Sequence, residues 1–110
     1  MTVEEISSLV GGRIAVAGHD ACIRTAYASD LLSDVMGHCK DESVLITIQN
    51  HLNTIAVCTL VGVEAVVICH DRPVPDDMAE AAKREGVAIL TTPLSQFEAS
   101  VALSGLAPSR

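Results

Sequence analysis

Aromatic and basic residues are both scarce in this chain of 110 residues, and each shortage excludes a class of partner. Tyr27 and Phe97 are its two aromatic residues, so the chain offers no platform on which nucleic-acid bases could stack. Its 14 acidic residues outnumber the 7 basic ones and give a net charge of −7. A surface of that sign repels phosphate backbones and anionic lipid headgroups. We therefore expect neither a nucleic acid nor a membrane among its partners.

Long apolar runs are missing as well. No window approaches the roughly 18 uninterrupted apolar residues of a membrane-spanning helix. The acidic start, MTVEEISSLV, lacks the basic and apolar regions of a signal peptide. We expect a cytoplasmic protein whose four cysteines are reduced. The length predicts one domain over residues 1–110.

Apolar periodicity predicts alternating helices and strands. Near-continuous apolar runs, such as VLITI at 44–48 and AVVIC at 65–69, are typical of parallel strands covered on both faces. The predicted fold class is α/β, with three α/β/α layers around a mostly parallel sheet of about four strands. The pattern predicts helices near 2–10, 29–39, 51–61, 76–85 and 94–103, strands at 13–17, 44–48, 65–69 and 87–90, a loop over 19–28 and a fraying tail over 106–110.

Capping signals set the expected helix boundaries. Thr2 and Glu5 have the spacing of a capping box, and Ser29 or Asp30 is placed to cap the second helix. Asn50 is the expected N-cap of the third helix. That helix is apolar on most sides, so we expect it to be deeply packed.

The stretch AYASDLLSDVMGH, residues 26–38, resembles the DRTGG domain family. The same order continues through TIQNHLNTIAV, AVVICHD and VAILTTPLSQF, so the resemblance covers about residues 12–104. Members of this family occur as small free-standing proteins, beside CBS domains in family pyrophosphatases, and at the N-terminus of some phosphate acetyltransferases. The domain is also similar to the N-terminal, non-catalytic domain of HPr kinase/phosphorylase. The resemblance implies a regulatory or assembly module, often dimeric, rather than a catalyst.

The chain departs from the family at the turn for which the family is named. The matching stretch reads CIRTAYASD, and Thr25 and Ala26 stand about where the two glycines would be. Glycine serves where the backbone needs a positive φ or where another group approaches closely. Either this turn follows a different backbone path, or it has lost the contact that the glycines allow.

Polar side chains follow every predicted strand. In a parallel sheet, ligands collect outside the carboxyl ends of the strands, and a helix start there favours an anion. His19 and Asp20 follow the first strand, and His70 and Asp71 follow the third. The remaining residues are the candidate ligand-binding set: Thr47, Gln49, Asn50, His51, Asn53, Thr54, Thr91, Thr92 and Ser95. Helix capping alone accounts for several of them, so structural capping and a site for a small anion or nucleotide both stay open.

Metal and catalytic chemistry have weaker support. His19 with Cys22, His38 with Cys39, and Cys69 with His70 form pairs, but none has the tight ligand spacing of a structural zinc site. Adjacent residues of a strand point to opposite faces, so Cys69 and His70 do not form a nucleophile and base. No glycine-rich phosphate loop follows a strand. We therefore expect no metal, no cofactor and no enzymatic activity.

These observations lead to one main hypothesis and one alternative. The main hypothesis is a regulatory or assembly module of DRTGG type that forms a homodimer and acts through a protein partner or a small ligand. A hydrophobic fraction of 49% and a mean hydropathy of +0.40 favour self-association, since so small a domain has a modest core. The alternative is a sensor domain that binds a nucleotide or a phosphorylated metabolite at the carboxyl edge of the sheet.

Overall fold

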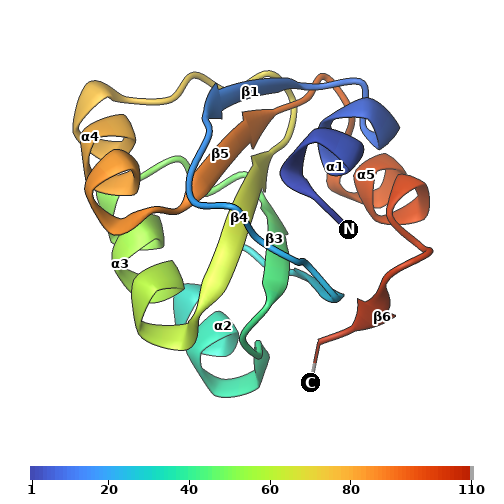
Figure 1. Cartoon of the computed structure of the whole chain (residues 1–110), viewed down its shortest axis with the longest axis horizontal. Helices are drawn as coiled ribbons and strands as arrows, with labels where there is room; N and C mark the ends of the chain where they lie inside the picture. Colours follow the sequence, from blue (N-terminus) through green and yellow to red (C-terminus); the bar gives the residue numbers. More distant parts are fainter. Residues whose placement is uncertain (110) are drawn as a thin grey trace.

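A computed structural model describes residues 1–109 (Figure 1). No helix in this range is both long enough and apolar enough to cross a bilayer. In chain order the elements are α1 (Val3–Leu9), β1 (Arg13–Val16), β2 (Thr25–Ala28), α2 (Leu32–His38), β3 (Ser43–Thr47), α3 (Leu52–Val61), β4 (Val63–Ile68), α4 (Asp76–Glu85), β5 (Ala88–Thr91), α5 (Gln96–Ala102) and β6 (Ala107–Pro108).

The strands form one sheet in the order β1-β5-β4-β3-β2-β6. The pairs from β5 through β6 are all parallel, whereas β1 lies antiparallel against β5, with Arg13 opposite Thr91. The predicted α/β class and mostly parallel sheet are confirmed. The predicted count of four strands is too low in the described chain, because β2 and β6 were not foreseen. The expected loop at 19–28 is wrong over its last four residues, which form β2.

Helices cover both faces of the sheet, so the predicted three layers are confirmed. Figure 1 shows α2, α3 and α4 on one side and α1 and α5 on the other. Every residue of β3 is buried, and successive side chains enter opposite layers. Leu45 joins the apolar cluster under α2–α4, whereas Val44 and Ile46 join the cluster under α1 and α5. This alternation explains why β3 is a continuous apolar run.

Three expectations about helix ends and packing need correction. Neither Ser29 nor Asp30 caps α2, which begins after Leu31. His51, and not Asn50, occupies the N-cap position of α3 and makes no side-chain capping bond. Nor is α3 deeply packed, because it lies in an outer layer and leaves Leu60 75% exposed. The predicted Thr2–Glu5 capping box of α1 is confirmed.

The predicted fraying of residues 106–110 is wrong for residues 107–109, which are ordered against the sheet. Residue 110 lies outside the described residues. β6 extends the sheet beside β2, and Ser109 is 3% exposed. Its hydroxyl accepts a hydrogen bond from the Lys40 N–H at 2.6 Å and lies 2.9 Å from the Ser43 hydroxyl. The Ser43 hydroxyl also lies 2.6 Å from that of Thr25, so the tail is fastened to a buried hydroxyl cluster. Mutual satisfaction of these groups offsets the cost of burying them.

We expect Ser109→Ala to lower the free energy of unfolding by about 1–2 kcal/mol, because the partly buried Lys40 N–H loses its hydrogen-bond acceptor. Chemical denaturation would measure the loss. Ser33→Ala is the matched control, since Ser33 is exposed and its hydroxyl makes no hydrogen bond within residues 1–109. Equal stability of the two variants would contradict the proposed fastening of the tail.

Candidate functional site at the carboxyl edge of the sheet

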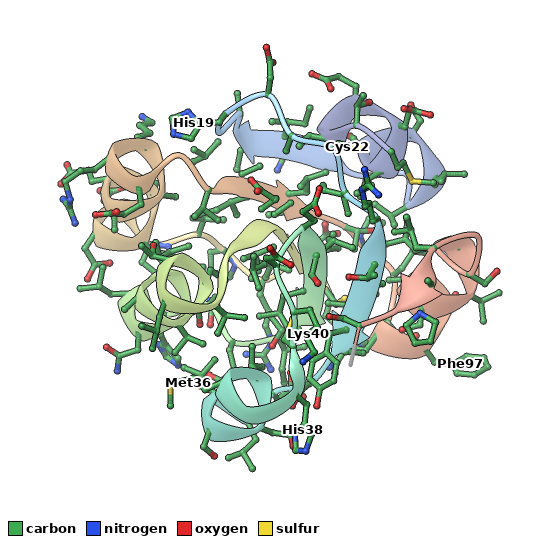
Figure 2. All side chains as sticks on the ribbon, turned by 60° about the horizontal axis from the view of Figure 1, so that its bottom comes forward. His19, Cys22, Met36, His38, Lys40 and Phe97 are labelled. Carbon is green, nitrogen blue, oxygen red and sulfur yellow. The ribbon has the colours of Figure 1, made fainter. Side chains whose placement is uncertain are left out.

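The carboxyl ends of β2, β3, β4 and β5 meet at one edge of the sheet because these strands are parallel. The direction of β1 changes which of its residues lie there. Its antiparallel pairing brings Arg13, at its amino end, beside Thr91. His19 and Asp20 therefore follow β1 at the opposite edge, and the expectation that they join the polar edge is wrong. Figure 2 shows His19 near the end of the sheet where α4 lies.

Asp30 is the centre of this edge, although the sequence pattern predicted for it only a role in capping α2. Its Oδ1 accepts hydrogen bonds from the Thr47 hydroxyl at 2.9 Å, the Ile48 N–H at 2.9 Å and the Gln96 side-chain amide at 3.0 Å. These bonds join the exit of β2 to the exit of β3 and to the start of α5. The carboxylate of Asp30 thus occupies the position in which donors at a strand end would hold an anionic ligand.

The charge of Asp30 is stabilised by the same contacts. Partial burial acts to raise the pKa of its carboxyl group, but the hydrogen bonds from Ile48, Thr47 and Gln96, together with the charge of Arg72, lower the pKa below its ordinary value. Asp30 is therefore ionised at neutral pH. An external anion would meet repulsion at this point of the edge.

Several of the predicted site residues form hydrogen bonds within the protein itself. The Gln49 side-chain amide donates to the Asp30 carbonyl at 2.8 Å, and its backbone N–H donates to the Thr47 hydroxyl at 3.1 Å. The Thr54 hydroxyl donates to the Gln49 carbonyl at 2.8 Å. The Asn50 side chain donates to the Pro73 carbonyl at 2.8 Å. Each of these groups already has a partner, so their presence in this stretch has a structural explanation.

The other predicted residues lie in separate places along the edge. The Thr92 hydroxyl is buried and donates to the Val10 carbonyl at 2.7 Å. Ser95 caps α5 in a capping box with Glu98. His51 and Asn53 are exposed at the start of α3. Thr91 lines a cleft described below. The structure brings Thr47 and Gln49 together, but it does not gather all nine residues around one cavity, and ligand binding by them remains a prediction.

The turn after β4 has an unusual backbone. His70 and Asp71 have φ values of 61° and 51°, in the left-handed region that non-glycine residues seldom adopt. Hydrogen bonds from the His70 N–H to the Leu94 carbonyl at 3.0 Å and from the Asp71 N–H to the Thr92 carbonyl at 2.9 Å hold them there. Strained backbone of this kind is found at functional sites more often than elsewhere. It directs the chain to Arg72 beside the exit of β5.

A cleft of about 650 Å³ lies between this turn and β1. That volume is in the range of small-molecule sites. The cleft is lined by Arg13, Ile14, Ala15, Asp71, Arg72, Pro73, Val74 and Thr91. Of the nine predicted site residues, Thr91 alone lines it. No sequence signal marked the two arginines, because they are 59 positions apart (72 − 13) and meet through the antiparallel strand.

A second polar cluster lies on α2. The Tyr27 hydroxyl donates to the Asp34 carboxylate at 2.6 Å, and the His38 Nδ1 lies 3.0 Å from the other Asp34 oxygen. The hydrogen bond to Asp34 raises the pKa of Tyr27 to about 12. The same bond is the main cause that lowers the pKa of Asp34. A phenol that stays protonated does not act as a base at neutral pH. Of this cluster, Tyr27 lines a shallow groove between β2 and α5. The i, i+4 spacing of Asp34 and His38 was the only signal of the cluster in the sequence.

Two of the buried cysteines are poor nucleophiles. Burial raises the pKa of Cys58 to about 12 and that of Cys69 to about 11, so both thiols stay protonated. Within residues 1–109, no three His, Cys, Asp or Glu side chains come together in a way that could hold a metal ion. The four cysteines are free in this range.

Comparison with known proteins identifies a similar structure but no sequence relative. Neither a scan against protein-family models nor a search of curated proteins finds a match. Among solved structures, the chain is similar to the CBS and DRTGG domains of the regulatory region of Clostridium perfringens pyrophosphatase, in complex with the activator diadenosine tetraphosphate. The TM-score is 0.76 at 12% identity, over 97% of this chain and 47% of that one. This likeness supports a DRTGG-like fold.

The likeness concerns the fold alone, at 12% identity. The chain spans about half of that regulatory region, at 47% of its length. The similarity covers 97% of this chain, so the expected DRTGG-like architecture is supported over nearly its whole length. Thr25 and Ala26 have a simple place in it: they belong to β2, paired with Ser43 and Val44, and make no turn.

Proposed function

We propose that this chain is a non-enzymatic regulatory or assembly module that acts as a homodimer. The regulatory class rests on the DRTGG-like fold, which it has in common with part of a pyrophosphatase regulatory region. Self-association rests on one observation, the exposed apolar face of α5. We define the α5 face as Phe97, Ser100, Val101 and Ser104.

The α5 face presents two exposed apolar side chains and two uncharged serines. Phe97 is 77% exposed and Val101, one turn further, is 56% exposed. Figure 2 shows the Phe97 ring projecting from α5 away from the sheet. Ser100 and Ser104 also line a shallow groove between α5 and β2. A solvent-exposed Phe beside a Val on one helix face is typical of an interface and has no function in the core of one copy.

The charge distribution favours a second copy as the occupant. The chain carries a net charge of −7, so most of its surfaces repel a second copy. The α5 face is an exception, because Glu98 is the one charged residue in the whole stretch 86–109. Two copies can therefore bring their α5 faces together with little electrostatic cost. A two-fold arrangement would place Phe97 of each copy against the other.

A competing apolar stripe runs along α3. Leu52, Ala56 and Leu60 follow one another at helical spacing, and all three are exposed. This stripe has charged neighbours, because Arg84 and Glu85 of α4 line the same groove. It also lies on the opposite side of the sheet from α5 (Figure 1). The two stripes can thus be tested separately by substitution.

We expect Phe97→Glu to abolish the dimer, because it would place two carboxylates against each other in an apolar contact. Light scattering coupled to size-exclusion chromatography would give twice the mass of one chain for the wild type and one chain for the variant. Leu60→Glu is the matched control: it adds the same charge at a site 75% exposed on α3 and should leave the mass doubled. A monomeric wild type, or a dimer broken by Leu60→Glu and not by Phe97→Glu, would contradict the proposed surface.

A sensor that binds a nucleotide or a phosphorylated metabolite is the second candidate. Its support is the pair His51 and Asn53, which present exposed polar side chains at the start of α3 beside the carboxyl edge. The internal use of Gln49, Asn50 and Thr54 leaves few further donors on this side. The ligand titration described next distinguishes this position from another one on the same edge.

A further inference from the structure

The cleft between β1 and the turn after β4 contains both arginines of residues 1–109 that form no ion pair. Two of the four arginines in residues 1–109 form ion pairs elsewhere: Arg24 lies 3.3 Å from Glu42, and Arg84 lies 3.6 Å from Glu85. The other two, Arg13 and Arg72, have no carboxylate within 4.0 Å in that range. Both line the same cleft. The charge of Arg72 acts on Asp30 from a longer distance, but neither guanidinium group is held by a direct ion pair. In a chain of net charge −7, two such groups on one cleft are unexpected.

We propose that this cleft binds the phosphoryl group of a small phosphorylated ligand between Arg13 and Arg72. Guanidinium groups match the oxygens of a phosphate in pairs of parallel hydrogen bonds. A phosphate ester carries close to two negative charges at neutral pH, so two arginines complement it better than they complement a single carboxylate. Asp71 also lines the cleft and repels an anion, which restricts the phosphoryl group to the space between the arginines.

The backbone positions of both arginines are fixed by contacts with the residues at the carboxyl end of β5. Gly12 packs so closely on β5 that a Cβ there would lie 2.4 Å from the Thr91 carbonyl oxygen, and its own carbonyl accepts a bond from the Ser7 hydroxyl at 3.0 Å. On the other side, the strained turn before Arg72 is bonded to the Thr92 and Leu94 carbonyls. The two side chains can move, but their starting points are fixed, which lowers the cost of ordering them around a ligand.

The lining limits the rest of the ligand. Ile14, Pro73 and Val74 provide an aliphatic wall, and no aromatic ring lines the cleft. A nucleobase would therefore have nothing to stack on. A sugar phosphate or another small aliphatic phosphate ester is the class that fits. The cleft lies at the β1 end of the sheet and the α5 face lies near the β2 end, so this inference does not depend on self-association.

An NMR titration of ¹⁵N-labelled full-length protein with inorganic phosphate and with ribose 5-phosphate tests the proposal. We expect saturable shifts of the backbone amide signals of residues 13–15 and 71–74. Arg13→Gln with Arg72→Gln should weaken binding about tenfold or more, since each hydrogen bond between charged groups contributes that order. The matched control is Arg24→Gln with Arg84→Gln, which removes the same two charges outside the cleft and should keep the affinity within about twofold.

Four results would overturn the proposal. The first is the absence of saturable shifts with either phosphate compound. The second is equal weakening in the control variant, because binding would then follow net charge. The third is acetate binding as tightly as phosphate, since the site would then select any small anion. The fourth is a shift confined to residues 49–54, which would favour the position predicted from the sequence. The dispersion of the amide signals reports in each case that the variant is folded, and the mass of the same samples reports self-association separately.

Discussion

Asp30→Ala should lower the free energy of unfolding by about 3 kcal/mol at neutral pH, one of the two largest effects of a single substitution that we expect. The Asp30 carboxylate accepts three hydrogen bonds, and the substitution removes the acceptor of all three donors. The Thr47 hydroxyl is fully buried, so its loss of a partner is costly, and bonds to a charged acceptor contribute more than neutral ones. For a domain of this size, the midpoint of thermal unfolding should fall by about 10–20 °C.

The effect of Asp30→Ala should depend on pH in a defined direction. The pKa of Asp30 is lowered in the folded protein from its ordinary value of 3.8. Its stabilising contribution is therefore complete above the pKa of the unfolded chain and is lost as the pH falls through the folded pKa. The difference between wild type and variant should be constant above about pH 5 and should shrink below about pH 4. Comparing the two proteins cancels the titration of the other acids whose pKa is lowered, such as Asp34 and Glu98.

Asp20→Ala is the control for the loss of one negative charge. Asp20 is exposed, and its side chain makes no hydrogen bond or ion pair within residues 1–109. Urea denaturation at several pH values would measure both variants. If Asp30→Ala were no less stable than Asp20→Ala at neutral pH, the three bonds would contribute nothing net. A difference that grew on acidification would contradict the direction of the pKa shift.

The architecture could be predicted because its causes are local. Continuous apolar runs such as 44–48 and 65–69 arise where a strand is buried on both faces, and capping residues such as Thr2 mark a helix start. β2 and β6 could not be predicted in the same way. Thr25–Ala28 is half-buried and lies toward the end of the sheet, so it needs no apolar run. Ala107–Pro108 is a strand because Ser109 is bonded to a cluster that is distant in sequence.

The candidate site was harder to predict because it depends on pairing between distant segments. Polar residues at the strand ends were correctly placed along the carboxyl edge at Thr47, Gln49 and Thr91. The sequence does not say which of these residues have hydrogen-bond partners within the fold. The structure shows that Asp30, two residues after β2, accepts the hydrogen bond of the Thr47 hydroxyl. Nor does it say that β1 is antiparallel, which is what brings Arg13 beside the exit of β5. Local sequence patterns thus located the carboxyl edge of the sheet, whereas the sheet topology decides which side chains meet there.

Gly12→Ala should be strongly destabilising for a reason other than backbone strain. The added methyl group would lie 2.4 Å from the Thr91 carbonyl oxygen, which belongs to the backbone and cannot rotate away as a side chain could. Either β1 moves away from β5 or the Thr91 peptide tilts, at a cost of about 2–3 kcal/mol. Since Arg13 is the next residue, we also expect the substitution to weaken phosphate binding in the cleft. Denaturation and the NMR titration would measure the two effects in the same sample.

Substitutions at two other glycines distinguish the effect of steric crowding from the effect of backbone strain. Gly105 has open space around it and no positive φ, so Gly105→Ala should be neutral or slightly stabilising. Gly11 has a φ of +60° with nothing within 4 Å, so Gly11→Ala should cost about 1 kcal/mol from its left-handed backbone alone. A Gly12→Ala variant as stable as Gly105→Ala would mean that β1 is not held tightly against β5. The backbone of Arg13 would then not be fixed, and the ligand itself would have to order the two arginine side chains. That ordering would weaken the affinity for phosphate measured in the wild-type titration.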